Sequence, residues 1–163
     1  MAFQDNTARY SRPGRIGKFW NISGLAVGPI EMGQYFKDDV MLIQTFLKRI
    51  AENLRSGAGS QGPPRPIPAV DGFFGPITKD WLSFFQGKKE LVPDGEVSKP
   101  PLGRSIGLRS GKPYCIFLLN EDFDALEHDW FMHLGTDSRT HPDLRAALRR
   151  NQPKGTPLDI TPP

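Results

Sequence analysis

The side chains of this sequence that could do chemistry are one cysteine and three histidines. Cys115 lies in the most apolar run of the chain, YCIFLLN at 114–120. A nucleophilic thiol needs a lowered pKa and a nearby base, whereas burial raises the pKa, so this run favours a buried small hydrophobe. His128 and His133 would lie roughly 140° apart around a helix, which is poor geometry for sharing one metal ion. No HExxH spacing occurs in the chain.

These patterns predict a protein that is not an enzyme and that carries no metal site and no cofactor. The sequence holds no Gly-x-Ser-x-Gly motif, no phosphate-binding loop and no dinucleotide fingerprint. Its single cysteine excludes an internal disulfide framework. One alternative stays open, in which Glu127, His133 and His141 converge in space without a sequence signature.

Composition and charge exclude further classes of protein. The chain has 163 residues, with 17 Gly and 16 Pro, which predicts many turns. No apolar run approaches the ~18 residues of a membrane span. The N-terminal MAFQDNTARYSRPGR lacks the apolar region of a signal peptide, so we expect synthesis in the cytoplasm. A net charge of +3 does not demand nucleic acid, and none is expected as a partner.

Helical periodicity marks four segments that must position any site. Apolar residues recur at helical spacing in 38–54, 76–88, 121–134 and 142–150. Between the first two, residues 56–69 are so rich in Pro and Gly that they predict a surface loop. The continuous apolar run at 114–120 predicts a short buried strand. A lone strand needs a partner, and the best candidate is the segment from Phe19 to Val27.

The dipeptide Asp-Gly occurs twice, at 71–72 and at 94–95. The aspartate of such a pair accepts hydrogen bonds from nearby backbone N–H groups, and the glycine takes the positive φ that the turn needs. Asp71 and Asp94 could instead contact a ligand, but the turn role is favoured for both because each is followed by glycine.

Two aromatic residues near the first turn could stack on a glycan or peptide. For Phe73 and Trp81 we favour core packing over ligand contact. The preference is stronger for Trp81, because helical spacing places it with Ile77 and Phe85.

Three motifs between residues 40 and 97 follow one another at a specific spacing. The first consists of Val40, Ile43, Gln44 and Leu47; the second is VDGFFGPIT at 70–78, continued by Trp81-Leu82 and Phe85-Gln86; the third is LVPDGEV at 91–97. In order and spacing they resemble the peptidoglycan-binding domain of the three-helix type. The family usually has Ala where Trp81 stands. The prolines of SKPP at 98–101 either shift the third helix past residue 101 or leave its place to the predicted strand and helix at 114–134.

The resemblance, over residues about 38–101, implies a mainly α fold built on a small helical peptidoglycan-binding-like bundle at 34–102. We expect an irregular basic arm at 1–33 before it. A strand-helix extension at 103–150 is expected to pack on the bundle, and an extended Pro-rich tail follows at 151–163.

The resemblance also implies a function, the non-catalytic binding of bacterial cell-wall peptidoglycan through its stem peptide or glycan. Backbone amides of the turns would hold stem-peptide carboxylates. Without a signal peptide, such a protein would reach the wall as component or cargo of a phage tail or a contractile or type VI secretion machine. The alternatives are a cytoplasmic protein–protein interaction module with the same fold, and a small wall hydrolase with its site in 103–150. The candidate ligand-binding residues are Asp71, Gly72, Phe73, Trp81, Asp94 and Gly95.

Charge is segregated along the chain. Residues 1–20 and 102–113 are basic, whereas the polar positions of 121–130 are acidic. These segments either pair within the molecule or provide a docking surface for a protein partner. The sequence leaves both readings open.

Overall fold

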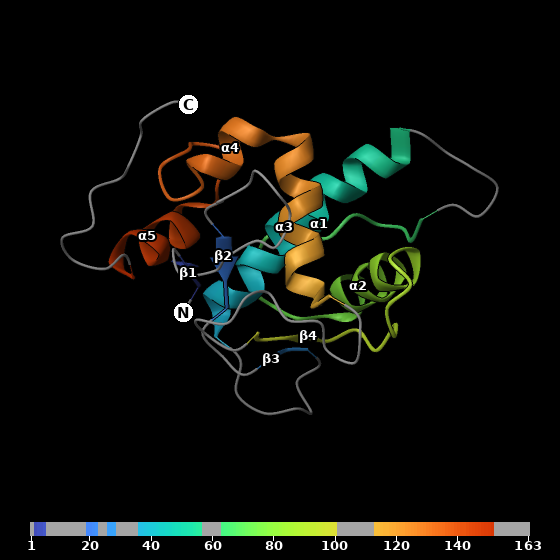
Figure 1. The fold of residues 1–163 in the computed structure, drawn as a ribbon. Coiled ribbons are helices and arrows are strands. Elements are labelled where there is room, and N and C mark those ends of the chain that lie inside the picture. The colour runs from blue at the N-terminus through green and yellow to red at the C-terminus, as the bar shows by residue number, and fades with distance from the viewer. Residues whose placement is uncertain are drawn as a thin grey trace.

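The computed structural model describes residues 2–5, 19–22, 26–28, 36–56, 63–100 and 113–151. Within these ranges the chain is mainly helical, as the sequence predicted, with short strands near the N-terminus (Figure 1). The helices are α1 (Lys37–Ser56), α2 (Pro76–Lys88), α3 (Cys115–Leu126), α4 (His128–Met132) and α5 (Pro142–Arg150). The strands are β1 (Phe3–Asp5), β2 (Phe19–Asn21), β3 (Ala26–Val27) and β4 (Val97–Ser98).

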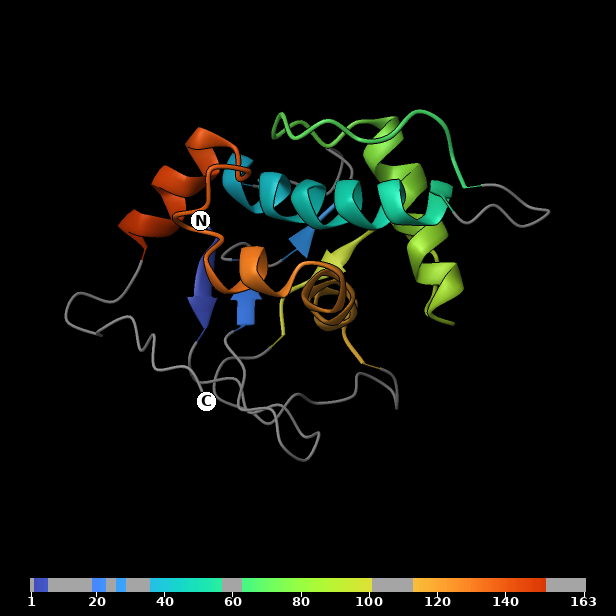
Figure 2. The ribbon, with the colours of Figure 1, turned by 90° about the horizontal axis from the view of Figure 1, so that it is seen from above.

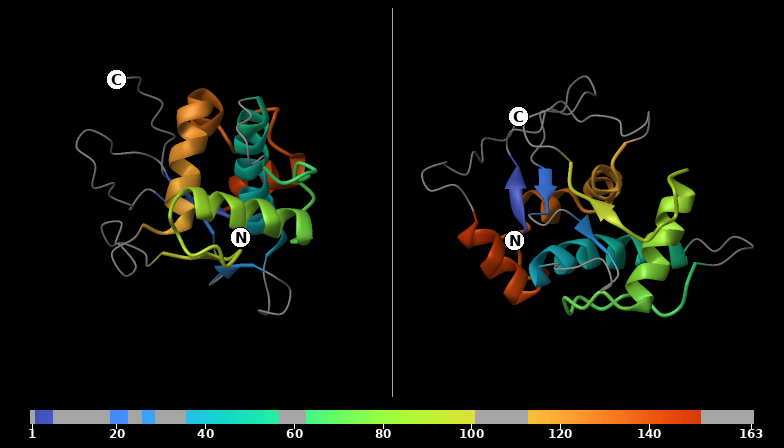
Figure 3. Two further views of the ribbon diagram at one scale, coloured as in Figure 1. Left: turned by 90° about the vertical axis from the view of Figure 1, so that its right-hand side faces the viewer. Right: turned by 90° about the horizontal axis from the view of Figure 1, so that it is seen from below.

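Helix α1 is the central element, and the other helices are arranged around it. Figure 2 shows α2 crossing α1 towards its C-terminal end, with α5 beside its N-terminal end and α3 viewed end on beneath it. The left panel of Figure 3 shows α2 running across both α1 and α3. An ion pair between Lys37 and Asp143, 3.2 Å long, joins the starts of α1 and α5.

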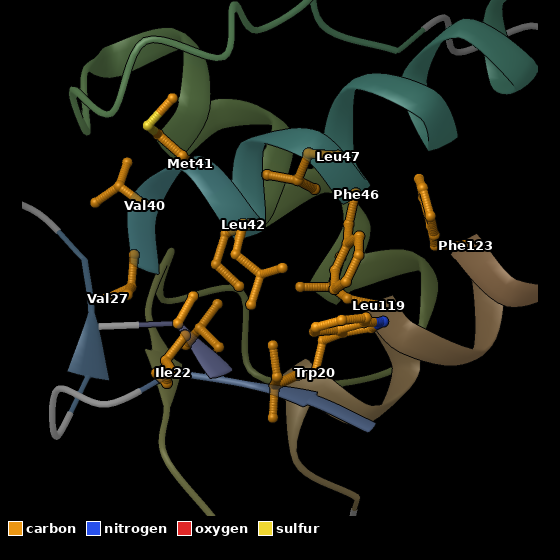
Figure 4. Packing of buried hydrophobic residues seen from close by; sticks show 14 of the residues in the cluster. Trp20, Ile22, Val27, Val40, Met41, Leu42, Phe46, Leu47, Leu119 and Phe123 are labelled. Carbon is orange, nitrogen blue, oxygen red and sulfur yellow. The ribbon is translucent and has the colours of Figure 1, made fainter. Parts of the chain in front are cut away.

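One hydrophobic core draws on the N-terminal strands, α1, α2 and the C-terminal helices alike. Trp20 from β2 and Leu119 and Phe123 from α3 point at the underside of α1 (Figure 4). The rings of Phe46 and Phe123 lie 4.8 Å apart between centroids. Residues from both ends of the chain share this core, and α3 and α5 both pack on α1.

The described parts of the N-terminal segment form strands, although the sequence predicted an irregular arm. β1 and β2 pair antiparallel, with Gln4 opposite Trp20. β3 and β4 also pair antiparallel, with Val27 opposite Val97, so the N-terminal segment is joined directly to the strand after the second Asp-Gly turn. The basic residues of the predicted arm, from Arg9 to Lys18, lie outside the described residues.

The predicted strand at 114–120 is wrong, because this run forms the first half of α3. Its buried residues include Ile116, Leu119 and Phe123, whose spacing is that of one helix face. Helices that are covered on several sides lose their polar stripe, and a short apolar run then has no periodicity that separates it from a buried strand.

The expected strand pairing between 114–120 and the N-terminal segment is replaced by a side-chain contact. The Asn120 carboxamide of α3 accepts a hydrogen bond from the Trp20 backbone N–H at 2.9 Å and donates one to the Trp20 carbonyl at 3.0 Å. The side chain thus satisfies both backbone groups of a strand residue, as a neighbouring strand would. The two segments do meet, but through an amide side chain.

The other element boundaries agree closely with the periodicity. Helices α2 and α5 span the predicted residues, and α1 is slightly longer than 38–54. The predicted helix at 121–134 is divided, because Glu127, at φ −146° and ψ 59°, separates α3 from α4. In the predicted loop at 56–69, residues 63–69 form neither helix nor strand, and residues 57–62 lie outside the described residues.

Candidate functional site

The first Asp-Gly turn is bound by a buried glutamine of α1. Gln44 Oε1 accepts hydrogen bonds from the backbone N–H groups of Asp71 and Gly72, at 3.1 and 2.8 Å. Its Nε2 lies within 3.2 Å of the Asp71 carboxylate, the Phe73 carbonyl and the Thr78 hydroxyl. A single side chain of α1 therefore holds both the turn and the first turn of α2.

The second Asp-Gly turn repeats this arrangement on α2. Gln86 Oε1 accepts a hydrogen bond from the Gly95 N–H at 2.9 Å, and its Nε2 donates to the Asp94 carboxylate and the Glu96 carbonyl at 2.8 Å each. In each turn the aspartate also accepts from the N–H two residues later, Phe73 in the first and Glu96 in the second. The favoured turn role of Asp71 and Asp94 is confirmed.

The hydrogen bonds within the turns bear on the expected binding of a ligand by their backbone amides. The amides at Asp71, Gly72, Phe73, Gly95 and Glu96 already donate to Gln44, Gln86 or the turn aspartates. A carboxylate from a stem peptide would have to break these bonds, so the turn amides are not a ready anion site. Ligand binding by these amides would therefore compete with hydrogen bonds that the fold already makes.

The two turn glycines have positive φ, 76° at Gly72 and 71° at Gly95, as the turn signature predicted. Both are also closely packed. A Cβ on Gly72 would lie 2.3 Å from Lys37 Cγ, and one on Gly95 would lie 2.9 Å from Lys79 Cγ. The positive φ and the close neighbouring atoms both require glycine at these positions, so the role of the two residues is structural.

The two candidate aromatic residues have opposite environments. Trp81 is 1% exposed and its indole N–H donates to the Pro66 carbonyl at 2.7 Å, so it belongs to the core and cannot stack on a ligand. Phe73 is 55% exposed, so the core packing favoured for it is wrong. Ile77, in the first turn of α2, is 41% exposed. Of the six predicted ligand residues, Phe73 alone presents an aromatic ring to solvent.

Cys115, the first residue of α3, is buried as predicted. Burial raises the pKa of its thiol far above the usual range, and the nearby Asp94 carboxylate raises the pKa further. Its environment is therefore the opposite of an activated thiol.

The three histidines and Glu127 have separate surroundings. His141 begins α5, where its Nδ1 accepts from the Asp143 N–H at 3.2 Å. His128 Nδ1 lies 2.6 Å from the Asp124 carboxylate, and His133 Nδ1 lies 2.9 Å from the Asp129 carbonyl. Among the residues that the structure describes, no three His, Cys, Asp or Glu side chains are gathered closely enough to hold a metal ion.

The acidic segment 121–130 forms ion pairs within the molecule. Asp122 pairs with Lys89 at 2.6 Å, and Glu127 pairs with Arg49 at 2.6 Å and with Arg139 at 3.1 Å. Arg139 also donates to Asp137, which lowers the pKa of that carboxyl group. These cations come from α1, from the end of α2 and from the 133–141 loop, whereas residues 102–112 of the basic segment lie outside the described residues.

A pocket of about 360 Å³ lies where the C-terminal parts of three helices meet. Its walls come from α1, the end of α2 and the end of α3, and none of the six predicted ligand residues contributes to it. The lining residues are Ile50, Asn53, Leu54, Phe85, Lys88, Lys89, Asp122, Ala125 and Leu126. Sequence reasoning missed this site, because α3 approaches α2 only in the folded chain.

Sequence reasoning also missed the roles of Gln44 and Gln86. Both stand in the motifs quoted above, each ahead of an Asp-Gly pair, and that repeated order was the available signal.

Comparison of the chain with models of protein families, with characterised proteins and with solved structures finds no match. Within the described residues, no helix combines the length and the apolar character needed to cross a bilayer.

Proposed function

We propose that this protein binds bacterial cell-wall peptidoglycan without cleaving it, as a component or cargo of a phage tail or of a contractile or type VI secretion machine. The observation that carries the proposal is the pair of glutamine-bound Asp-Gly turns. Gln44, Asp71 and Gly72 interact in the first turn, and the corresponding residues of α2 and 94–96 interact in the second. All belong to the motifs that resemble the peptidoglycan-binding domain.

In this proposal the motif residues are the scaffold, and the exposed side chains beside them contact the wall. Phe73 follows the first turn directly, and Ile77, in the first turn of α2, is also an exposed apolar side chain. An aromatic face of this kind packs on the C–H face of a sugar ring or on the side chains of a stem peptide. Tightly bonded turns would fix the Phe73 backbone, which lowers the entropy lost on binding.

The test is co-sedimentation of the full chain with isolated sacculi at low salt. We expect the wild-type protein to sediment and Phe73→Ala to remain largely in the supernatant. Val92→Ala is the matched control, because Val92 is also apolar and is 71% exposed but lies in the second turn. Wild-type protein that stays in the supernatant at tens of micromolar would contradict wall binding. The same supernatants should contain no soluble muropeptides, and their release would favour the hydrolase alternative.

A second candidate is a cytoplasmic protein–protein interaction module. The exposed apolar side chains Phe36, Phe73 and Ile77, which lie before α1 and around the start of α2, favour it, because aromatic side chains are enriched in protein interfaces. The sacculus assay separates the two candidates, since an interaction module has no reason to sediment with wall material.

A further inference from the structure

The pocket between α1, α2 and α3 combines an apolar floor with a charged rim. Ile50 and Phe85 are almost fully buried at its base, and Leu54 and Leu126 are half-buried at its sides. At about 360 Å³, the pocket is at the small end of the range for ligand sites. It can take one or two small residues of a peptide, but no large cofactor.

The charges on the rim do not cancel. Lys89 and Asp122 form an ion pair of 2.6 Å, with the Lys89 ammonium 5.6 Å from the centre of the Phe85 ring. Lys88 is exposed, and its ammonium lies 5.5 Å from the centre of the Phe84 ring. It has no carboxylate partner among the described residues. The rim therefore carries one uncompensated positive charge next to an apolar hollow.

A lysine in the last turn of a helix is favoured by the helix dipole whether or not a ligand binds. That preference explains Lys88, but it does not account for the apolar hollow that lies beside it at the surface. A ligand that fits both the cation and the hollow has an anionic group and a small aliphatic body.

We propose that this pocket binds the C-terminal carboxylate of a short peptide with small aliphatic side chains. The carboxylate pairs with the Lys88 ammonium, and the aliphatic groups lie on Phe85, Leu54 and Leu126. This inference rests on the proposed function for its biological ligand, which is then the alanine-terminated stem peptide of the wall. The pocket itself needs α3, which lies outside the segment that resembles the peptidoglycan-binding domain.

One stripe of α2 carries Ile77, near the start of the helix, and Lys88, at the pocket. Phe84 follows Ile77 by 7 residues, and Lys88 follows it by 11. At these spacings all three residues lie within about 20° of one line along the helix. The distance from Ile77 to Lys88 along the axis is ~17 Å. A glycan strand on Phe73 and its attached peptide in the pocket are compatible with that separation.

The test is an NMR titration of the full ¹⁵N-labelled chain with N-acetyl-D-alanyl-D-alanine. We expect shifts at the backbone amides of Lys88, Lys89, Ala125 and Leu126. The same dipeptide with a C-terminal amide should bind roughly tenfold more weakly, because it lacks the charge-assisted contact. Lys88→Met, which keeps the aliphatic stem, should show a similar loss, whereas the exposed Lys48→Met on α1 should bind as the wild type does.

Ala125→Trp provides a second, steric variant, because Ala125 is exposed on α3 and a large side chain there fills the mouth of the pocket. It should abolish the shifts while the remaining spectrum stays that of the folded chain. If the wild-type protein shows no chemical-shift changes at millimolar dipeptide, the pocket proposal is wrong, even where the protein still co-sediments with sacculi. Pocket shifts without sedimentation would instead support the pocket and contradict wall binding.

Discussion

The two Asp-Gly turns use the same residues but connect different parts of the molecule. In the first turn the glutamine comes from α1, 27 positions before Asp71, and joins two helices. In the second turn Gln86 is only 8 positions before Asp94, so the bonds close a local loop. The first turn leads into α2 and the second leads into β4. One arrangement thus serves once as a tertiary connection and once as a local one.

The first turn also makes more hydrogen bonds to its glutamine than the second turn does. In the first turn, Gln44 accepts hydrogen bonds from the backbone N–H groups of both Asp71 and Gly72. In the second turn, only the Gly95 N–H donates to Gln86, because the Asp94 N–H donates to the Val92 carbonyl at 2.9 Å. Gln44 additionally contacts the Thr78 hydroxyl of α2. More of the first turn depends on its glutamine, so the two turns should respond unequally to the same substitution.

The largest expected effect is that of Gln44→Met. The substitution keeps the shape of the side chain but leaves several buried polar groups without partners, at about 3 kcal/mol of unfolding free energy. Gln86→Met should cost about 2 kcal/mol, because fewer groups lose a partner. Urea unfolding followed by circular dichroism measures both. Equal losses, or a larger loss for Gln86→Met, would contradict the distinction between a tertiary and a local turn.

A smaller difference is expected at the glycines. An alanine at Gly72 would place its Cβ 3.1 Å from the backbone carbonyl of Lys37 as well as against that side chain, so the start of α1 must shift. At Gly95 the close atoms belong to the side chains of Lys79 and Ser83, which can rotate away. We expect losses of about 2–3 kcal/mol for Gly72→Ala and about 1–2 kcal/mol for Gly95→Ala.

Gly87 on α2 is the control for this pair, because a Cβ there would meet nothing within 4 Å. Gly87→Ala should raise the unfolding free energy by about 0.5–1 kcal/mol, since alanine is the better helix former. Thermal unfolding of the three variants gives the comparison. A stabilised Gly72→Ala would show that the positive φ and close packing at that turn have been misassigned.

The sequence predicted helices well where one face is apolar and the other polar, as in α2 and α5, whose limits agree with the periodicity. It failed at 114–120, because a segment covered by β2, α1 and β4 has no polar face to reveal its period. The division at Glu127 was also unpredicted; the carboxylate of that residue pairs with Arg49 and Arg139.

The candidate site was predicted only in part. Local chemistry was sufficient for the Asp-Gly turns, whose hydrogen-bonding and positive φ follow from residue type. It was insufficient for Phe73, whose exposure depends on how the turn is held against α1, and for the pocket at Lys88, which requires α3. Burial and pocket formation depend on contacts between distant segments, which no local pattern contains.

The central claim is that the turn amides are bound internally, so that the motif residues form a scaffold and ligands bind beside them. Amide hydrogen exchange at Gly72 and Gly95 in the full chain tests this most directly. The account predicts exchange at least roughly a hundredfold slower than in an unfolded chain at both positions. Exchange at the unfolded rate at Gly72 and Gly95, while the amide of Phe46 in α1 remains protected, would contradict it and make these amides available to a ligand.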